Sequence, residues 1–185
     1  KNFEGFSRVL TGVVVPRPIA LVSTKSADGI VNLAPFSFFN AVAYDPPTII
    51  FSSSRRTGEE GEKTKDTLAN IEATGEFVIA VVVDEIAEAM NRTAAEYPAD
   101  VNEFEIAGLT EATADIVAPP LVADSPVNME CRLVQVVTIG NRIAVSSASA
   151  RGRGGLLDVR TVFLLEQELE SELDLSRSRG SAADS

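Results

Sequence analysis

The chain has 185 residues, of which 45% are hydrophobic and 23% are charged, and its formal net charge is −11. This length suits one domain with a sizeable core, and the composition is ordinary for a globular protein. The negative charge argues against nucleic acid or an anionic membrane as a partner, because both need clustered Lys and Arg.

The sequence shows neither a membrane-spanning run nor a signal peptide, and both bear on where the protein is found. No apolar run approaches the roughly 20 residues that span a bilayer. Residues 1–6 lack the apolar core of a signal peptide. We therefore expect a cytoplasmic protein without a membrane partner.

Histidine is absent and Cys131 is the single cysteine, which excludes several catalytic classes. Ser-His-Asp triads, Cys-His dyads and His-ligated metals need histidine, and we expect no metal site. A disulfide within the chain or a CxxC redox motif needs a second cysteine. Cys131 stands in an alternating, strand-like stretch, so we favour a buried thiol over a reactive one. Any difficult chemistry would then belong to a bound cofactor.

The first half of the chain is predicted to be β-structure. Residues 19–24 form a short apolar strand, and the Asp-Gly pair at 28–29 is typical of a hairpin turn. Residues 31–43 are expected to return antiparallel to it as one strand. The Asp-Pro-Pro segment at 45–47 ends that strand, and residues 48–52 begin the next. This order predicts a meander or a small barrel.

Small polar side chains interrupt the apolar run over 31–47. Asn32, Ser37 and Asn40 stand where a buried strand would carry Val or Ile. A buried polar group without a partner costs about 1–3 kcal/mol, so we expect a ligand to satisfy these three. Pro35 cannot donate to a central ladder and marks an edge or a bulge. The run therefore predicts a binding place for a flat polar ligand.

A polar loop is predicted over 52–65, followed by a short helix over 68–74. Asp66 or Thr67 is its natural N-cap. Gly75 stands where a left-handed residue would end the helix.

The second half contains the strongest strand, over 76–83, whose nearly continuous apolar character predicts a central position. A second helix is expected from Asp84 to about Ala95. Residues 127–139 read as a long strand, and a turn at 140–141 leads into another. Because the helices are inserted between strands instead of alternating with them, the pattern favours an α+β barrel over a doubly wound sheet.

The helix start at Lys65, Asp66 and Thr67 has the chemistry of an anion site. Free N–H groups, the helix dipole and the Lys65 charge favour an anion, and Ser52 and Ser53 add donors. A capped surface helix is the competing interpretation, which we favour from the local sequence alone.

Arg17 is similarly open to two interpretations. It stands between two prolines, which hold its backbone extended. Its guanidinium is aimed either at a phosphate or at an acidic neighbour.

Eight short motifs occur in one order along the chain. They lie at 15–24, 32–40, 45–47, 65–71, 76–78, 90–98, 103–109 and 125–133. Their order resembles that of the flavin reductase-like family of FMN-binding split barrels, in particular the flavin reductase component of two-component monooxygenases such as nitrilotriacetate monooxygenase. Many motifs in one order are more specific than any one of them. The resemblance covers about 9–140. At Lys65, Asp66 and Thr67 it reverses our preference, so that we now favour an anion site over a capped surface helix.

The resemblance implies an α+β, mainly β fold, a split β-barrel with inserted short helices. Such proteins usually form homodimers that hold FMN in a groove at the interface. NAD(P)H would donate a hydride to the flavin, a step that needs stacking and alignment more than a protein acid or base. No catalytic side chain is assigned. The residues expected to contact FMN are Arg17, Asn32, Pro35, Phe36, Ser37, Phe39, Asn40, Ser52, Ser53, Lys65, Asp66 and Thr67.

Three functions are open at this point. The first is an NAD(P)H-dependent flavin reductase that supplies reduced flavin to a partner monooxygenase. The second is an FMN-binding module without turnover, its pocket incomplete because the C-terminal sequence is atypical for the family. The third is a structural domain that has kept the fold and lost the flavin site.

The chain divides into a flavin reductase-like domain over 1–150 and an atypical tail over 151–185. The tail is biased toward Arg, Gly, Ser and Ala. We expect it to be mobile, although residues 161–173 have the pattern of one amphipathic helix.

Overall fold

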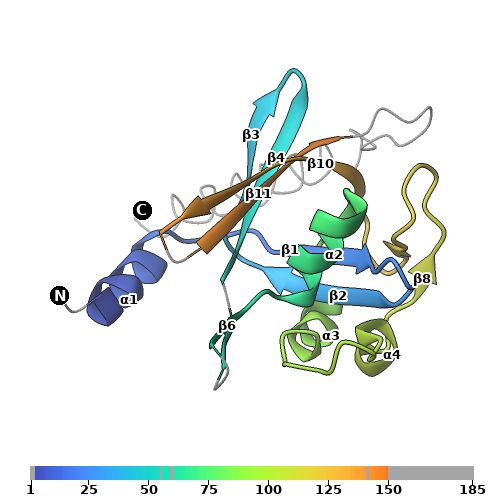
Figure 1. Cartoon of the computed structure of the whole chain (residues 1–185), viewed down its shortest axis with the longest axis horizontal. Helices are drawn as coiled ribbons and strands as arrows, with labels where there is room; N and C mark the ends of the chain where they lie inside the picture. Colours follow the sequence, from blue (N-terminus) through green and yellow to red (C-terminus); the bar gives the residue numbers. More distant parts are fainter. Residues whose placement is uncertain (1–2, 55, 59–60, 141, 150–185) are drawn as a thin grey trace, which may run out of the picture. The chain divides into compact units, whose positions relative to one another are not determined.

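A computed structural model describes residues 3–54, 56–58, 61–140 and 142–149 (Figure 1). The tail over 151–185, with its predicted helix, lies outside the described residues. The described strands are β1 Ala20–Lys25, β2 Val31–Phe36, β3 Phe39–Tyr44, β4 Pro47–Ser54, β5 Arg56–Gly58, β6 Gly61–Lys63, β7 Glu76–Val81, β8 Glu111–Ala112, β9 Leu121–Val122, β10 Asn128–Ile139 and β11 Arg142–Ser149. The described helices are α1 Phe3–Val13, α2 Asp66–Thr74, the 3₁₀ turn η1 Asp84–Ile86, α3 Ala87–Arg92 and α4 Glu103–Ala107.

The main sheet of the described residues is antiparallel and has seven strands in the order β2-β1-β7-β10-β11-β4-β3. Its two outer strands, β2 and β3, are separated in sequence by Ser37 and Phe38 alone. Three Cα–Cα steps span at most about 11 Å, so the sheet must curl until its outer strands approach at this corner. The two strands are not neighbours in the sheet, so the barrel stays open there. Figure 1 shows β3 and β4 running steeply across β1 and β2.

The expectation of one strand over 31–43 is wrong. β2 pairs with β1 through a turn in which Gly29 has a φ of 90°, as predicted. β3 leaves that hairpin and pairs with β4. Both halves of the run are apolar and no glycine marks the corner, so the strand pattern continues across it.

Two expectations for residues 52–75 need correction. A small hairpin of β5 and β6 occupies part of the predicted loop. α2 begins at Asp66, with Lys65 as its N-cap residue and no side-chain capping bond, so neither Asp66 nor Thr67 is the cap. The predicted end is confirmed, because Gly75 is left-handed with a φ of 72°.

The second half largely follows the prediction. β7 lies between β1 and β10 and is buried along most of its length, which confirms its central position. β10 and β11 form the predicted long hairpin. The helix expected over 84–95 is shorter, with Asp84 as the first residue of η1 and α3 ending at Arg92.

The core lies on both faces of the sheet. Alternation along β1 sends Val22 into one cluster, with Phe51 and Phe77, and Leu21 into another, with Phe104 of α4. Burying each such side chain contributes about 1.5–3 kcal/mol. Helices α2 and α4 are each held to the sheet by one of these clusters.

Cys131 lies in the first cluster and is fully buried. Burial raises the pKa of the Cys131 thiol to about 12. The prediction of an unreactive buried thiol is confirmed. Within the described residues, no helix is long and apolar enough to cross a membrane.

Candidate functional site

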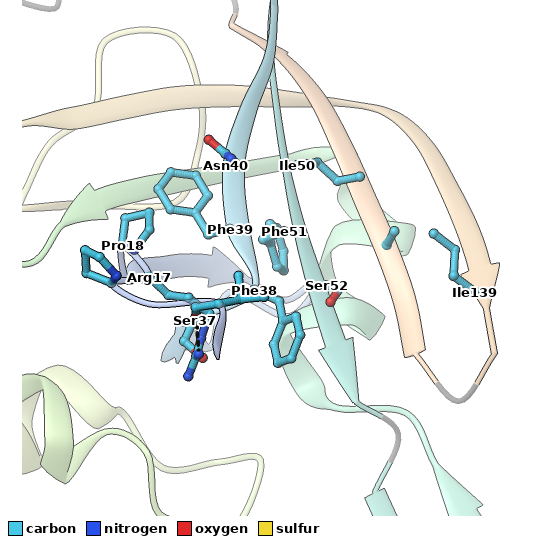
Figure 2. Close-up of a pocket in the computed structure, with 13 residues that line it drawn as sticks. Arg17, Pro18, Ser37, Phe38, Phe39, Asn40, Ile50, Phe51, Ser52 and Ile139 are labelled. Atoms are coloured by element: carbon cyan, nitrogen blue, oxygen red, sulfur yellow. Dashed lines mark hydrogen bonds between the residues drawn. The ribbon is translucent and has the colours of Figure 1, made fainter. Parts of the chain in front are cut away.

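A cavity of about 360 Å³ opens beside the corner between β2 and β3 (Figure 2). Most of its wall is apolar, and the corner itself contributes Phe38 and Phe39. Pro16 and Pro18 add rigid surface from the segment before β1. Both the volume and the apolar character are typical of a small-molecule site. We call this the larger cavity.

The polar groups of the larger cavity come from three separate segments. Arg17 precedes β1, Ser37 and Asn40 flank the corner, and Ser52 lies on β4. Together with Phe39, these are five of the residues that the sequence predicts for FMN binding. The Asn40 side-chain oxygen accepts a bond from the Ala41 N–H at 2.9 Å, so that oxygen already has a partner.

Two guanidinium groups lie close to the Phe38 ring. The central carbon of Arg142 lies 4.2 Å from the ring centroid and that of Arg17 lies 5.7 Å from it. Arg142 also donates from Nε to the Ser52 hydroxyl at 2.9 Å and from Nη2 to the Ser52 carbonyl at 2.8 Å. Burial lowers the pKa of Arg142 from its ordinary value, but a guanidinium stays charged in proteins.

Arg17 is anchored by one nitrogen. Its Nη1 donates to the carbonyl oxygens of Thr11 and Val14, at 2.7 and 2.8 Å, near the end of α1. Its Nε is buried and has no partner within the described part of the chain. An unsatisfied buried donor costs about 1–3 kcal/mol, so this nitrogen is available to a ligand oxygen.

A smaller cavity of about 100 Å³ is lined by five more of the predicted residues. Asn32 and Pro35 come from β2, and Lys65, Asp66 and Thr67 come from the start of α2. The Lys65 ammonium also lies 5.8 Å from the centroid of the Phe36 ring.

Asn32 does not need a ligand for its amide nitrogen. Its Nδ2 donates to the Thr67 hydroxyl at 3.0 Å, and both residues are buried. This corrects the expectation that a bound molecule satisfies that amide. The bond ties the edge strand β2 to the first turn of α2.

A carboxylate that sequence reasoning missed holds the same strand. The Glu103 side chain of α4 is 8% exposed and accepts the N–H of Leu33 at 2.9 Å. β2 is the outer strand of its sheet, which confirms the edge predicted from Pro35. No local signal marks Glu103, because its partner lies 70 residues away.

Phe36 and Ser53 do not reach either cavity with their side chains. Phe36 is 5% exposed and packs on Phe51 in the core. Ser53 is 1% exposed and its hydroxyl donates to the carbonyl of Ser54 at 3.1 Å. The reason is strand alternation, which turns Ser52 toward the larger cavity and Ser53 away from it.

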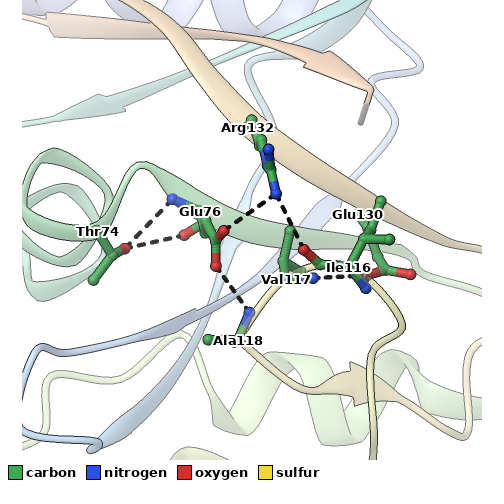
Figure 3. Close-up of polar contacts among 7 residues, drawn as sticks. All are labelled: Thr74, Glu76, Ile116, Val117, Ala118, Glu130 and Arg132. Atoms are coloured by element: carbon green, nitrogen blue, oxygen red, sulfur yellow. Dashed lines mark hydrogen bonds and ion pairs between the residues drawn. The ribbon is translucent and has the colours of Figure 1, made fainter. Parts of the chain in front are cut away.

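Other polar contacts brace the sheet away from both cavities (Figure 3). Glu130 accepts the N–H groups of Ile116 and Val117, at 2.7 and 3.1 Å, and Glu76 accepts that of Ala118 at 2.9 Å. These carboxylates hold the segment between α4 and β9 against β7 and β10. They are structural.

The fold is thus an open antiparallel barrel with a cavity at the corner between β2 and β3. The family profile of the flavin reductase like domain matches residues 12–151. The chain belongs to this family. The match continues past residue 140, where the resemblance was expected to end, so β11 and its Arg142 are part of the family domain.

Two relatives match this chain over part of their own length. An uncharacterized protein of Aquifex aeolicus is 46% identical over 132 residues, which are 71% of this chain and 66% of that protein. One of Halalkalibacterium halodurans is 43% identical over 135 residues, which are 73% of this chain and 63% of that protein. The matches thus span just under two thirds of the length of these relatives.

Solved structures share the fold. Component B of nitrilotriacetate monooxygenase from Bacillus cereus is 32% identical with a TM-score of 0.76, over 82% of this chain and 76% of that chain. The 2-nitrobenzoate 2-nitroreductase NbaA of Pseudomonas fluorescens is 29% identical with a TM-score of 0.71, over 87% and 77%. A Shewanella frigidimarina protein described as having a split barrel domain is 21% identical with a TM-score of 0.70, over 88% and 83%. The predicted α+β, mainly β split barrel is confirmed.

Proposed function

We propose that the protein binds FMN at the β2–β3 corner and reduces it with a hydride from NAD(P)H. The observation that carries this proposal is the larger cavity, where aromatic walls meet a buried Arg17 Nε that has no partner within the described residues. Membership in the flavin reductase like domain family supports a flavin as the ligand.

The residues of the site fit such a cofactor. A flavin ring is flat and apolar on its faces and polar at its edges, which suits Phe38, Phe39 and the prolines together with Ser37. Asn32, Lys65 and Thr67 offer further polar contacts in the smaller cavity. Thr67 accepts from Asn32 and so keeps its own hydroxyl hydrogen to donate.

FMN supplies the electron chemistry when bound, and the chain contributes binding, orientation and exclusion of water. The short link at the corner fixes Ser37 and Phe38 between two strands, so this wall is held by the sheet. The lack of histidine is compatible with this role, because alignment is the main requirement.

Anaerobic titration tests the function. The protein is reconstituted with FMN, freed of excess flavin, and titrated with NADH and then NADPH while the flavin absorbance is followed. Bleaching of bound flavin by either nucleotide is the expected result. Bound flavin that neither nucleotide bleaches would instead support an FMN-binding module without turnover, and failure to bind flavin would contradict both functions.

We also propose that two copies pair through the sheet half formed by β10, β11, β4 and β3. Large apolar side chains are exposed on its strands: Tyr44 is 94% exposed, Val134 61% and Ile139 60%. Exposed apolar surface of this kind marks interaction sites. Light scattering during size-exclusion chromatography should give twice the monomer mass, and a monomer mass at micromolar concentration would contradict the pairing.

The similarity to component B of nitrilotriacetate monooxygenase supports a partner oxygenase that receives the reduced flavin. Coupled assays test this step: reduced flavin produced by the chain should support turnover by a flavin-dependent oxygenase supplied without its own reductase. An oxygenase that turns over equally well without the chain would contradict it.

A further inference from the structure

Arg17 lines the larger cavity, and Arg142 contacts two residues that line it, Ser52 and Phe38, which the proposed function alone does not explain. We propose that Arg17 and Arg142, with the Ser52 hydroxyl, form a binding site for the phosphate of a nucleotide. The proposal rests on the proposed function, in which both FMN and NAD(P)H carry phosphate.

Arg142 has donors to spare. Its two bonds to Ser52 use two of the five N–H groups of the guanidinium, which leaves three. Those two bonds also fix the group in place, so little side-chain freedom is lost when a ligand binds. A fixed planar fork of N–H groups matches the oxygens of a phosphate.

The same contact leaves the hydroxyl hydrogen of Ser52 unused. Its Oγ accepts from Arg142 Nε, so its own O–H is available to another oxygen. Ser52 lines the larger cavity, as Figure 2 shows beside Phe38. A donor next to a guanidinium is the arrangement that an oxyanion needs.

Arg17 supplies the second cation. Its Nη1 is held by the carbonyls of Thr11 and Val14, and its buried Nε has no partner in the described residues. A ligand oxygen at that nitrogen would satisfy it. The guanidinium carbons of Arg17 and Arg142 lie 5.7 and 4.2 Å from the centroid of the same Phe38 ring, so both cations are close to one wall of the cavity.

The charge of the two cavities favours the arginine site for an anion. Among the residues that the structure describes, no acidic side chain lines the larger cavity. The smaller cavity has Lys65 together with three carboxylates, those of Asp66, Glu96 and Glu103. A phosphate is therefore repelled more strongly at the start of α2 than beside the arginines.

The test uses three variants and a control. Arg142→Met and Arg17→Met remove the donors, and Arg142→Lys keeps the charge and removes the fork. Arg132→Met is the matched control, because Arg132 lies on β10 with its side chain 61% exposed and pairs with Glu76 at 3.8 Å (Figure 3). Circular dichroism establishes that each variant is folded.

Two arms distinguish the source of the phosphate. If the flavin supplies it, Arg142→Met weakens binding of FMN by about tenfold or more and leaves riboflavin within twofold, since a charged hydrogen bond is lost. If the nicotinamide nucleotide supplies it, flavin binding is unchanged and the KM for the nucleotide that bleaches the flavin rises by about tenfold. Arg142→Lys should show a smaller loss in the same arm.

The result that overturns the proposal is equal behaviour of all variants and the control in both arms. A failure of the proposed function looks different, because then the unmodified protein binds neither FMN nor riboflavin. In that case calorimetry with inorganic pyrophosphate tests the site directly: binding that Arg142→Met abolishes supports it, and no binding contradicts it. If Arg142→Met does not fold, the same binding and KM measurements on Arg17→Met and Arg142→Lys test the proposal.

Discussion

The larger cavity is lined by the corner, β3 and β4, the smaller one by β2 and the start of α2, and the two differ in how their polar groups are used. At the larger one, Arg17 and the neighbouring Arg142 keep unused donors, and no carboxylate among the described residues lines it. In the smaller one, Asn32 is bonded to Thr67 and Glu103 to the backbone of Leu33. Polar residues that look alike in sequence thus serve different purposes. We propose that one set binds a ligand, and the other fastens an edge strand to two helices.

The largest effect that this comparison predicts is at Glu103. Glu103→Ala leaves the Leu33 N–H without its acceptor and opens space at a nearly buried position. We expect the free energy of unfolding to fall by about 2–4 kcal/mol. Urea denaturation measures it.

The control for Glu103 lies on the same helix. Glu105→Ala changes an exposed carboxylate of α4 and should alter stability by less than about 0.5 kcal/mol. Equal losses for the two variants would show that Glu103 does not fasten β2.

The next effect concerns Thr67. Thr67→Val keeps the shape and removes the hydroxyl that accepts from Asn32, so about 1–2 kcal/mol of stability should be lost. Because we place the phosphate at the arginines, the dissociation constants of FMN and riboflavin should change by the same factor. Thr113→Val, at an exposed position, is the control. A loss confined to FMN would move the phosphate to the start of α2.

The effect that is smallest at neutral pH, where it vanishes, is the pH dependence due to Cys131, which lies in the core away from both cavities. Its pKa is raised from 9.0 to about 12 in the folded state, so above pH 9 the unfolded chain binds fewer protons than the folded one. Stability should therefore be lost by about 1 kcal/mol per pH unit between pH 9 and 12, and kept below pH 9. Comparing the slope of unfolding free energy against pH with that of Cys131→Ala measures this. Parallel slopes would contradict it.

Local sequence predicted the elements whose signals are local. The Asp28–Gly29 turn, the buried strand β7 and the left-handed Gly75 are each marked by one or a few adjacent residues. The corner at Ser37 and Phe38 was missed, because apolar residues on both sides conceal a change of pairing partner. Which strand a segment joins depends on the whole sheet.

Residues inside a motif could be named as candidates for the site from the sequence, whereas contacts between distant segments could not. Arg142 meets Ser52 across 90 residues, and Glu103 meets Leu33 across 70. Phe38 lies within a predicted motif, but its contacts with Arg17 and Arg142 bring together three separate segments. Ser52 and Ser53 looked equivalent in sequence, and strand alternation separated them.

The bond from Glu103 to Leu33 has a consequence for how chains can associate. An outer strand normally offers its free N–H and C=O groups to a strand of another molecule. On β2 the Leu33 N–H is already taken by a buried carboxylate, and Pro35 has no N–H to offer. A foreign strand would find neither of these two donors, so edge-to-edge growth along β2 is disfavoured. This protection of one sheet edge is consistent with the pairing that we propose, which uses side chains on the sheet and not the backbone of β2.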